Sequence, residues 1–131
     1  MTSDERLLVD LVNHERTSRG LRPLSVDARM MQAARAKAKD IADLGYFDHY
    51  SPTYGSPYAM LTAFGVPWQY AGENIARQVR GARDIHYMFM GSPGHRANIL
   101  YEFYTHLGVG VVVDRYGRTV VAEEFAKLRG Y

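Results

Sequence analysis

The first 44 residues carry apolar side chains at helical spacing, in two separate runs. Ser3 and Asp4 can cap a first helix, and Gly20 followed by Pro23 ends it. The apolar positions that mark one face of this helix are Leu7, Leu8, Leu11 and Val12. Ser25 is the predicted cap of a second helix, which runs through an alanine-rich segment. Its apolar positions are Met30, Ala34, Ala38 and Ile41. Their small size predicts a helix that packs closely against another element.

The middle of the chain is predicted to be irregular before it becomes helical again. Residues 46–58 contain two Ser-Pro pairs and a glycine, which favour turns. Ser56 caps a short helix with proline at its first position, and Gly65 closes that helix. Two further helices are expected, over residues 83–90 and 92–100.

The last quarter of the chain changes to the period of a strand. Residues 107–113 alternate larger apolar side chains with glycine and valine, and the Asp-Arg-Tyr-Gly sequence at 114–117 predicts a turn. Residues 119–125 return as a second strand, so a hairpin is expected. Helices followed by a hairpin indicate an α+β fold, with helices packed on an antiparallel sheet.

Composition places the chain among single-domain globular proteins. Its 131 residues, 47% hydrophobic and 23% charged, suffice for one core, so we expect one domain over residues 1–131. No apolar run approaches the ~18 residues that a membrane span needs. The net charge of +2 comes from 16 basic and 14 acidic residues without a basic stripe, which argues against nucleic-acid binding. The chain has no cysteine, which excludes a disulfide scaffold and thiol catalysis.

Five histidines are the first candidates for chemistry, and no two of them lie three or four residues apart. The sequence therefore has no helical metal motif of the His-Glu-x-x-His type. His14 is expected on a solvated helix face, and packing at a strand end explains His106. His86 lies on a predicted short helix whose phase does not decide whether it is buried.

His49, His95 and Glu73 stand apart because of their neighbours. His49 follows Tyr-Phe-Asp in an aromatic loop, and His95 lies directly after a Ser-Pro-Gly turn. Binding residues concentrate in loops that a rigid scaffold presents. Glu73 follows a glycine, which lets the backbone approach another group closely. Spacing alone does not bring these three residues together.

Four segments around these residues make the chain recognisable. They are residues 47–52 (FDHYSP), 71–76 (AGENIA), 92–100 (SPGHRANIL) and 105–110 (THLGVG). In this order they strongly resemble the bacterial branch of the CAP superfamily, the SCP-like group of cysteine-rich secretory proteins, venom allergens and plant pathogenesis-related proteins. Asn13, Arg16 and Pro23-Leu24 match as well, so the resemblance spans residues 5–126. It implies a three-layer α-β-α sandwich with an antiparallel sheet.

The resemblance also implies a large solvent-open cleft lined by two histidines and two glutamates, which in some members holds zinc or another divalent ion. The residues that match the first histidine, the glutamate of the Gly-Glu-Asn motif and the second histidine are His49, Glu73 and His95. The second glutamate has no counterpart here. Phe89 stands at the family's tryptophan position, and Gly91-Ser92-Pro93 occupies the stretch where the acid would fall. Glu123 stands where a glutamine is expected.

Tyrosines and small polar residues near these motifs suggest the walls of the cleft. The expected lining residues are Tyr50, Ser51, Tyr54, Asn74 and Ser92. An amphipathic aromatic wall suits contact with a glycan, a peptide or a lipid. Two imidazoles and one carboxylate form a reasonable ligand set for Zn²⁺ or another divalent cation, and no organic cofactor is expected.

Three functions follow from the resemblance, and the sequence leaves all three open. A binding or interaction module comes first, followed by a metal-dependent hydrolase of peptide or cell-wall substrates and by a structural envelope domain. The implied location is extracellular or in the cell envelope. Because the chain starts without an apolar export segment, we expect an export signal or an envelope anchor upstream of Met1 in the full-length product. The domain is expected to be a monomer.

Overall fold

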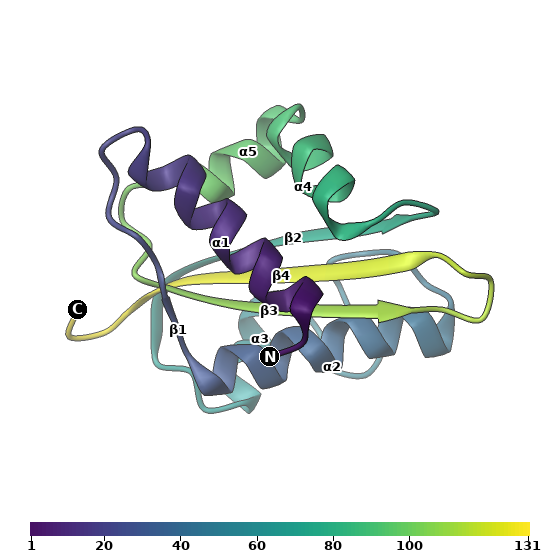
Figure 1. The fold of residues 1–131 in the computed structure, drawn as a ribbon. Helices are drawn as coiled ribbons and strands as arrows, with labels where there is room; N and C mark the ends of the chain where they lie inside the picture. Colours follow the sequence, from purple (N-terminus) through teal and green to yellow (C-terminus); the bar gives the residue numbers. More distant parts are fainter.

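The computed structural model describes all residues, 1–131, as five helices and four strands (Figure 1). In chain order these are α1 (Ser3–Thr17), β1 (Ser25–Val26), α2 (Ala28–Leu44), α3 (Pro57–Ala63), β2 (Trp68–Gln78), α4 (Ala82–Met90), α5 (Pro93–Leu100), β3 (His106–Val113) and β4 (Thr119–Leu128). The predicted helices and the C-terminal hairpin are all present. Ser56 caps α3 as expected, with its hydroxyl accepting from the amide of Ala59.

The caps of the first two helices differ from the prediction. Thr2 caps α1, because its hydroxyl accepts from the Glu5 amide while the Glu5 carboxylate accepts from the Thr2 amide. Asp27, and not Ser25, caps α2, with its carboxylate accepting two backbone amides of the first turn. Ser25 lies instead in β1, which the hydroxyl-cap pattern could not distinguish from a helix start.

β2 is the long strand that the sequence pattern did not predict. It carries Gly72, Glu73 and Asn74 at its centre, so it lacks the alternation of apolar and polar residues that identifies a strand. The segment pairs with β4 from Trp68–Leu128 to Gln78–Thr119. The pairing with β4, and not the local preference of these residues, makes the segment a strand.

The sheet has the order β1-β3-β4-β2, which places β2 at one edge. β3, β4 and β2 pair antiparallel, and the two residues of β1 add a short parallel edge beside β3. Helices α1, α4 and α5 cover one face of the sheet, while α2 and α3 cover the other (Figure 1). The three-layer α-β-α arrangement that the family resemblance implied is confirmed.

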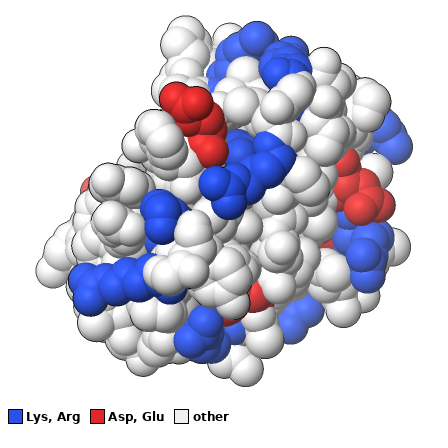
Figure 2. Space-filling view, turned by 90° about the vertical axis from the view of Figure 1, so that its left-hand side faces the viewer, with Lys and Arg blue, Asp and Glu red and all other residues white.

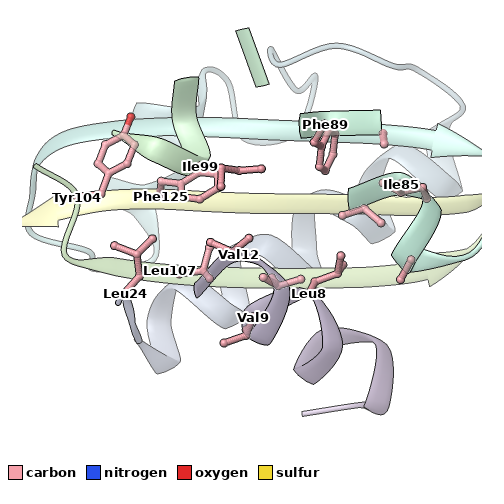
Figure 3. Close-up of a cluster of buried hydrophobic side chains, with 14 residues drawn as sticks. Leu8, Val9, Val12, Leu24, Ile85, Phe89, Ile99, Tyr104, Leu107 and Phe125 are labelled. Carbon is pink, nitrogen blue, oxygen red and sulfur yellow. The ribbon is translucent and has the colours of Figure 1, made fainter. Parts of the chain in front are cut away.

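The larger hydrophobic core lies between the sheet and the layer of α1, α4 and α5 (Figure 3). Its labelled members are Leu8, Val9, Val12, Leu24, Ile85, Phe89, Ile99, Tyr104, Leu107 and Phe125. The helices α1, α4 and α5 and the strands β2, β3 and β4 thus contribute side chains to one continuous apolar layer, which anchors α4 and α5 above the edge strand β2.

On the opposite face, α2 rests directly on the backbone of β3. A Cβ atom added to Gly108 would lie 2.2 Å from the carbonyl of Met30, and one added to Gly110 would lie 2.4 Å from the carbonyl oxygen of Ala34. The alanines of α2 and the glycines of β3 therefore fit together, as the small residues of the helix predicted.

The surface in Figure 2 shows Lys and Arg scattered over the face, with Asp and Glu between them and no continuous basic stripe. None of the five helices is both long and apolar enough to cross a membrane.

Candidate functional site

The backbone at His49 is held in place by a buried lysine. Lys37 lies on the apolar face of α2 and is 1% exposed. Its Nζ donates to the carbonyl oxygens of Asp48 at 2.8 Å and of His49 at 2.6 Å. A buried ammonium needs such partners, and here the partners are the backbone of the loop that follows α2. The loop conformation at His49 therefore depends on Lys37.

The His49 side chain reaches the edge strand and contacts Glu73. Its Nδ1 donates to Glu73 Oε1 at 2.8 Å, with the Glu73 side chain buried and the imidazole 55% exposed. This hydrogen bond raises the pKa of His49, against the opposing effect of burial. The contact fixes which ring nitrogen bears the proton and leaves the other nitrogen, Nε2, without a protein partner.

A second buried carboxyl faces Glu73 across the sheet. Glu124 is its direct neighbour on β4, and the side chain of Glu124 is fully buried with both oxygens unpaired. Burial and the negative charge of Glu73 both raise the pKa of Glu124 well above its ordinary value. The protonated form of Glu124 is therefore favoured beside Glu73.

His95 approaches the same edge strand from the other helical layer. It lies in the first turn of α5, with Nδ1 at 2.9 Å from Ser92 Oγ and its ring centroid 4.9 Å from that of Phe89. Burial lowers the pKa of His95, and the positive charge of His49 lowers it further. The pKa values of the two histidines are thus shifted in opposite directions, upward for His49 and downward for His95.

A hydrogen-bonded network below His95 includes Asn74 and Glu123. The Asn74 amide donates to the carbonyl oxygen of His95 at 3.1 Å and to Glu123 Oε1 at 3.3 Å. Asn98 donates to Asn74 Oδ1 at 3.0 Å and to the Glu73 carbonyl at 3.2 Å. Burial raises the pKa of Glu123 to about 8, so this carboxyl is neutral at pH 7 like the glutamine expected in its place.

His49 separates two cavities along the outer edge of β2. One cavity of about 370 Å³ lies between the helical layers. Its walls are Phe47, Asp48, His49, Ile75, Ala76, Arg77, Gln78, Met88, Phe89, Ser92 and His95. The other, of about 350 Å³, is lined by His49, Pro57, Tyr58, Ala71, Gly72, Glu73 and Asn98. The structure therefore brings His49 and His95 to one cavity, and His49 and Glu73 to the other.

The sequence profile of the cysteine-rich secretory protein (CAP) family matches residues 9–125. The chain belongs to this family.

The relatives of this CAP domain include bacterial proteins of greater length. Bacillus subtilis YkwD is 47% identical over 108 residues, which make up 82% of this chain and 42% of YkwD. An extracellular protein with an SCP domain from Bacillus anthracis has 34% identity and a TM-score of 0.88, over 95% of this chain and 40% of its own. An outer surface protein of Borrelia burgdorferi shares the fold at 14% identity, with a TM-score of 0.90 over 98% and 95% of the two chains. This chain spans less than half of YkwD.

The donor atoms of this CAP domain do not form a ready metal site. No three side chains among histidine, aspartate and glutamate are arranged to hold an ion. Glu73 already accepts from His49 Nδ1, which is the position of a carboxylate that orients a ligand histidine. The Nδ1 atoms of His49 and His95 are both hydrogen-bonded, so Nε2 is the ring nitrogen that each histidine has left for another partner.

Of the five residues expected to line the cleft, Ser92 does so. The other four lie elsewhere. Tyr50 is 65% exposed outside both cavities, and Tyr54 packs against Phe64 at a ring separation of 5.8 Å. Ser51 is buried because its hydroxyl donates to Asp40 at 2.6 Å. Asn74 is also buried, because it faces the layer of α4 and α5 and hydrogen-bonds there.

The remaining histidines lie outside the two cavities. His14 is exposed, and His106 Nδ1 lies 2.7 Å from the Thr105 hydroxyl at the start of β3. His86 is fully buried and bonds Glu15 of α1 at 2.7 Å, so it joins two helices of one layer.

Lys37 and Glu124 are site residues that the sequence analysis did not identify. A signal for Lys37 was present, since position 37 falls on the apolar face marked by residues 30, 34 and 41. A charged residue on such a face calls for a buried partner. Glu124 could not be identified without knowing that β2 is a strand, because only the register of β2 with β4 places Glu124 opposite Glu73.

Proposed function

We propose that this CAP domain is an extracellular or envelope-located binding module that captures its ligand along the outer edge of β2. The observation that carries the proposal is the position of His49, which Lys37 and Glu73 hold rigidly at the boundary of two open cavities. Such preorganisation favours binding, because little conformational entropy remains to be lost.

The walls of the two cavities define the kind of ligand. Phe47, Phe89 and Met88 provide apolar surface in one cavity, and Tyr58 provides an aromatic ring in the other. Polar side chains such as Asp48, Arg77 and Gln78 lie beside this apolar surface, so the cavity offers both kinds of contact, as sites for amphipathic ligands do. A segment of a glycan, peptide or lipid chain fits this pattern.

The stretch between Phe89 and His95 also supports binding over hydrolysis. Gly91, Ser92 and Pro93 offer no second carboxylate, and Glu73 is committed to His49. Glu124, the carboxyl that faces Glu73 across the sheet, is fully buried, so hydrolysis by two carboxylates within reach of a substrate lacks a partner for Glu73.

The test compares capture with turnover on the same materials. We expect the protein to be retained on purified cell wall, and His49→Ala to lose that retention at least tenfold. His14→Ala, which removes an exposed histidine from α1, is the matched control. A panel of peptide, peptidoglycan and ester substrates, with and without Zn²⁺, measures turnover. Robust turnover that Glu73→Gln abolishes would replace this proposal with a metal-dependent hydrolase.

We infer in addition that the site binds a divalent ion weakly, with Zn²⁺ preferred by the two imidazoles. Such an ion would supply a Lewis acid and a bound water. Because the ligating nitrogens must be unprotonated, affinity should fall as the pH drops below ~6.5. Calorimetric titration of Zn²⁺ into the wild type and into the His49→Ala, His95→Ala double variant measures this. Equal affinity in the two proteins would place the metal elsewhere.

A further inference from the structure

One end of the sheet carries an unusual concentration of exposed apolar side chains. Here β2 ends, the β3–β4 hairpin turns, and α2 reaches its C-terminus (Figure 1). The side chains, with their exposed fractions, are Val79 (78%), Tyr116 (72%), Val113 (67%) and Leu44 (56%). Val79 and Tyr116 are the two most exposed large hydrophobic side chains of the whole chain. We call these four residues, together with the arginines described next, the sheet tip.

The four segments of the sheet tip are joined to one another. Gln78, which precedes Val79, pairs with Thr119 of β4, and Thr119 pairs with Val113 of β3. Arg115 of the hairpin donates to the carbonyl oxygen of Asp43 at 3.3 Å, next to Leu44. Arg77 donates to the carbonyl oxygen of Gly45 at 3.2 Å. The exposed side chains therefore lie at one end of the sheet, with Val113 on the side of α1 and Leu44 on the side of α2.

Arginines surround these apolar side chains. The four at this end are Arg77, Arg80, Arg115 and Arg118. Two of them flank one ring, because the guanidinium carbons of Arg115 and Arg118 lie 6.0 Å and 5.2 Å from the centroid of Tyr116.

Two acids at this end are paired with basic side chains, while Asp4 and Asp84, in the first turns of α1 and α4, have no ion pair. Asp114 accepts from Arg118 at 2.7 Å, and Asp43 pairs with Lys39. Arg77, Arg80 and Arg115 have no carboxylate partner. Asp4 of α1 borders β3 on the side near Val113. The sheet tip is thus an apolar surface with a positive border.

This combination is the one that peripheral proteins use at a membrane interface. Aliphatic and aromatic side chains enter the boundary between headgroups and acyl chains, while arginines remain at the level of anionic headgroups. A soluble polyanion would engage the guanidinium groups but would leave the valines and Leu44 in water. We propose that the sheet tip is a docking surface for the anionic face of a lipid bilayer, separate from the cavities beside His49.

Vesicle flotation tests the proposal with the full chain. The probes are vesicles of phosphatidylcholine alone and of phosphatidylcholine with phosphatidylglycerol. We expect the wild type to float only with the anionic vesicles, and increasing salt to weaken the association. Arg80→Gln with Arg115→Gln should bind about 30-fold more weakly. Val79→Ser with Tyr116→Ser should bind at least tenfold more weakly.

Matched variants separate the sheet tip from the rest of the molecule. Tyr131→Ser with Arg129→Gln removes one exposed aromatic and one exposed arginine from the opposite end of the sheet, and it should float like the wild type. His49→Ala should also float normally, which keeps this test independent of the cavities. Circular dichroism and thermal unfolding establish that each variant is folded.

Several outcomes would overturn the proposal. These are no flotation of the wild type, equal flotation with neutral vesicles, or equal losses in the Tyr131→Ser, Arg129→Gln control. Full competition by soluble polyphosphate, together with wild-type binding by Val79→Ser, Tyr116→Ser, would identify a site for an anionic polymer instead.

Discussion

Replacing Glu123 by glutamine is expected to stabilise the protein at neutral pH by about 3 kcal/mol more than it does in acid. Glu123 is fully buried, and burial raises its pKa from 4.5 to about 8. Between these two pKa values the native state keeps a proton that the unfolded state has released. The stability of the wild type must therefore fall as the pH rises through this window. Glutamine keeps the hydrogen bond from Asn74 and has no proton to lose.

Chemical unfolding at a series of pH values measures this effect. The difference in free energy of unfolding between Glu123→Gln and the wild type should grow by about 1.4 kcal/mol for each pH unit up to about pH 8. Glu102→Gln, at an exposed position in the loop after α5, controls for the loss of one negative charge. A difference that stays constant with pH would show that Glu123 is ionised in the native state.

Replacing Gly108 by alanine is expected to destabilise the fold by about 3 kcal/mol. The added methyl group would lie 2.2 Å from the backbone carbonyl of Met30 and 2.6 Å from the amide nitrogen of Met31. Helix backbone cannot move aside as a flexible side chain can, so α2 must shift away from β3. That shift would also disturb Lys37, and with it the loop that carries His49.

Thermal and chemical unfolding of Gly108→Ala measure the loss of stability. Gly94→Ala is the matched control, because no atom lies within 4 Å of the added methyl group and alanine is the better helix former in α5. We expect this control to be neutral or slightly stabilising. If Gly108→Ala is as stable as Gly94→Ala, α2 does not rest on the backbone of β3.

The helices and the hairpin could be predicted because their local patterns agree with their tertiary environment. The start of α3 is determined by Ser56 and Pro57, and the strand over residues 107–113 by its alternating valines. A few neighbouring residues therefore suffice to predict each of them. β2 could not be predicted in this way. Its centre, Gly72 to Asn74, breaks the strand pattern because those residues serve the site and the network beneath it.

The site could be predicted only in part, again because local sequence patterns do not reveal tertiary contacts. His49, Glu73 and His95 are recognised by motif resemblance, but their contacts depend on the edge position of β2. Ser51 and Asn74 are buried with partners that sequence spacing does not reveal, namely the Asp40 carboxylate for Ser51 and the His95 carbonyl for Asn74. Two buried groups next to the site, Lys37 under the His49 loop and Glu124 opposite Glu73, resemble ordinary surface residues when only composition is considered.

The central place of β4 has a consequence for how the chain matures. β4 lies between β3 and β2, although residues 119–128 are synthesised after every other strand. β2 has no neighbour in the sheet until those residues leave the ribosome, so the edge that carries the site cannot form during earlier synthesis. Such long-range closure slows folding. A nascent chain that stays open in this way remains suited to threading through a translocation channel before it folds.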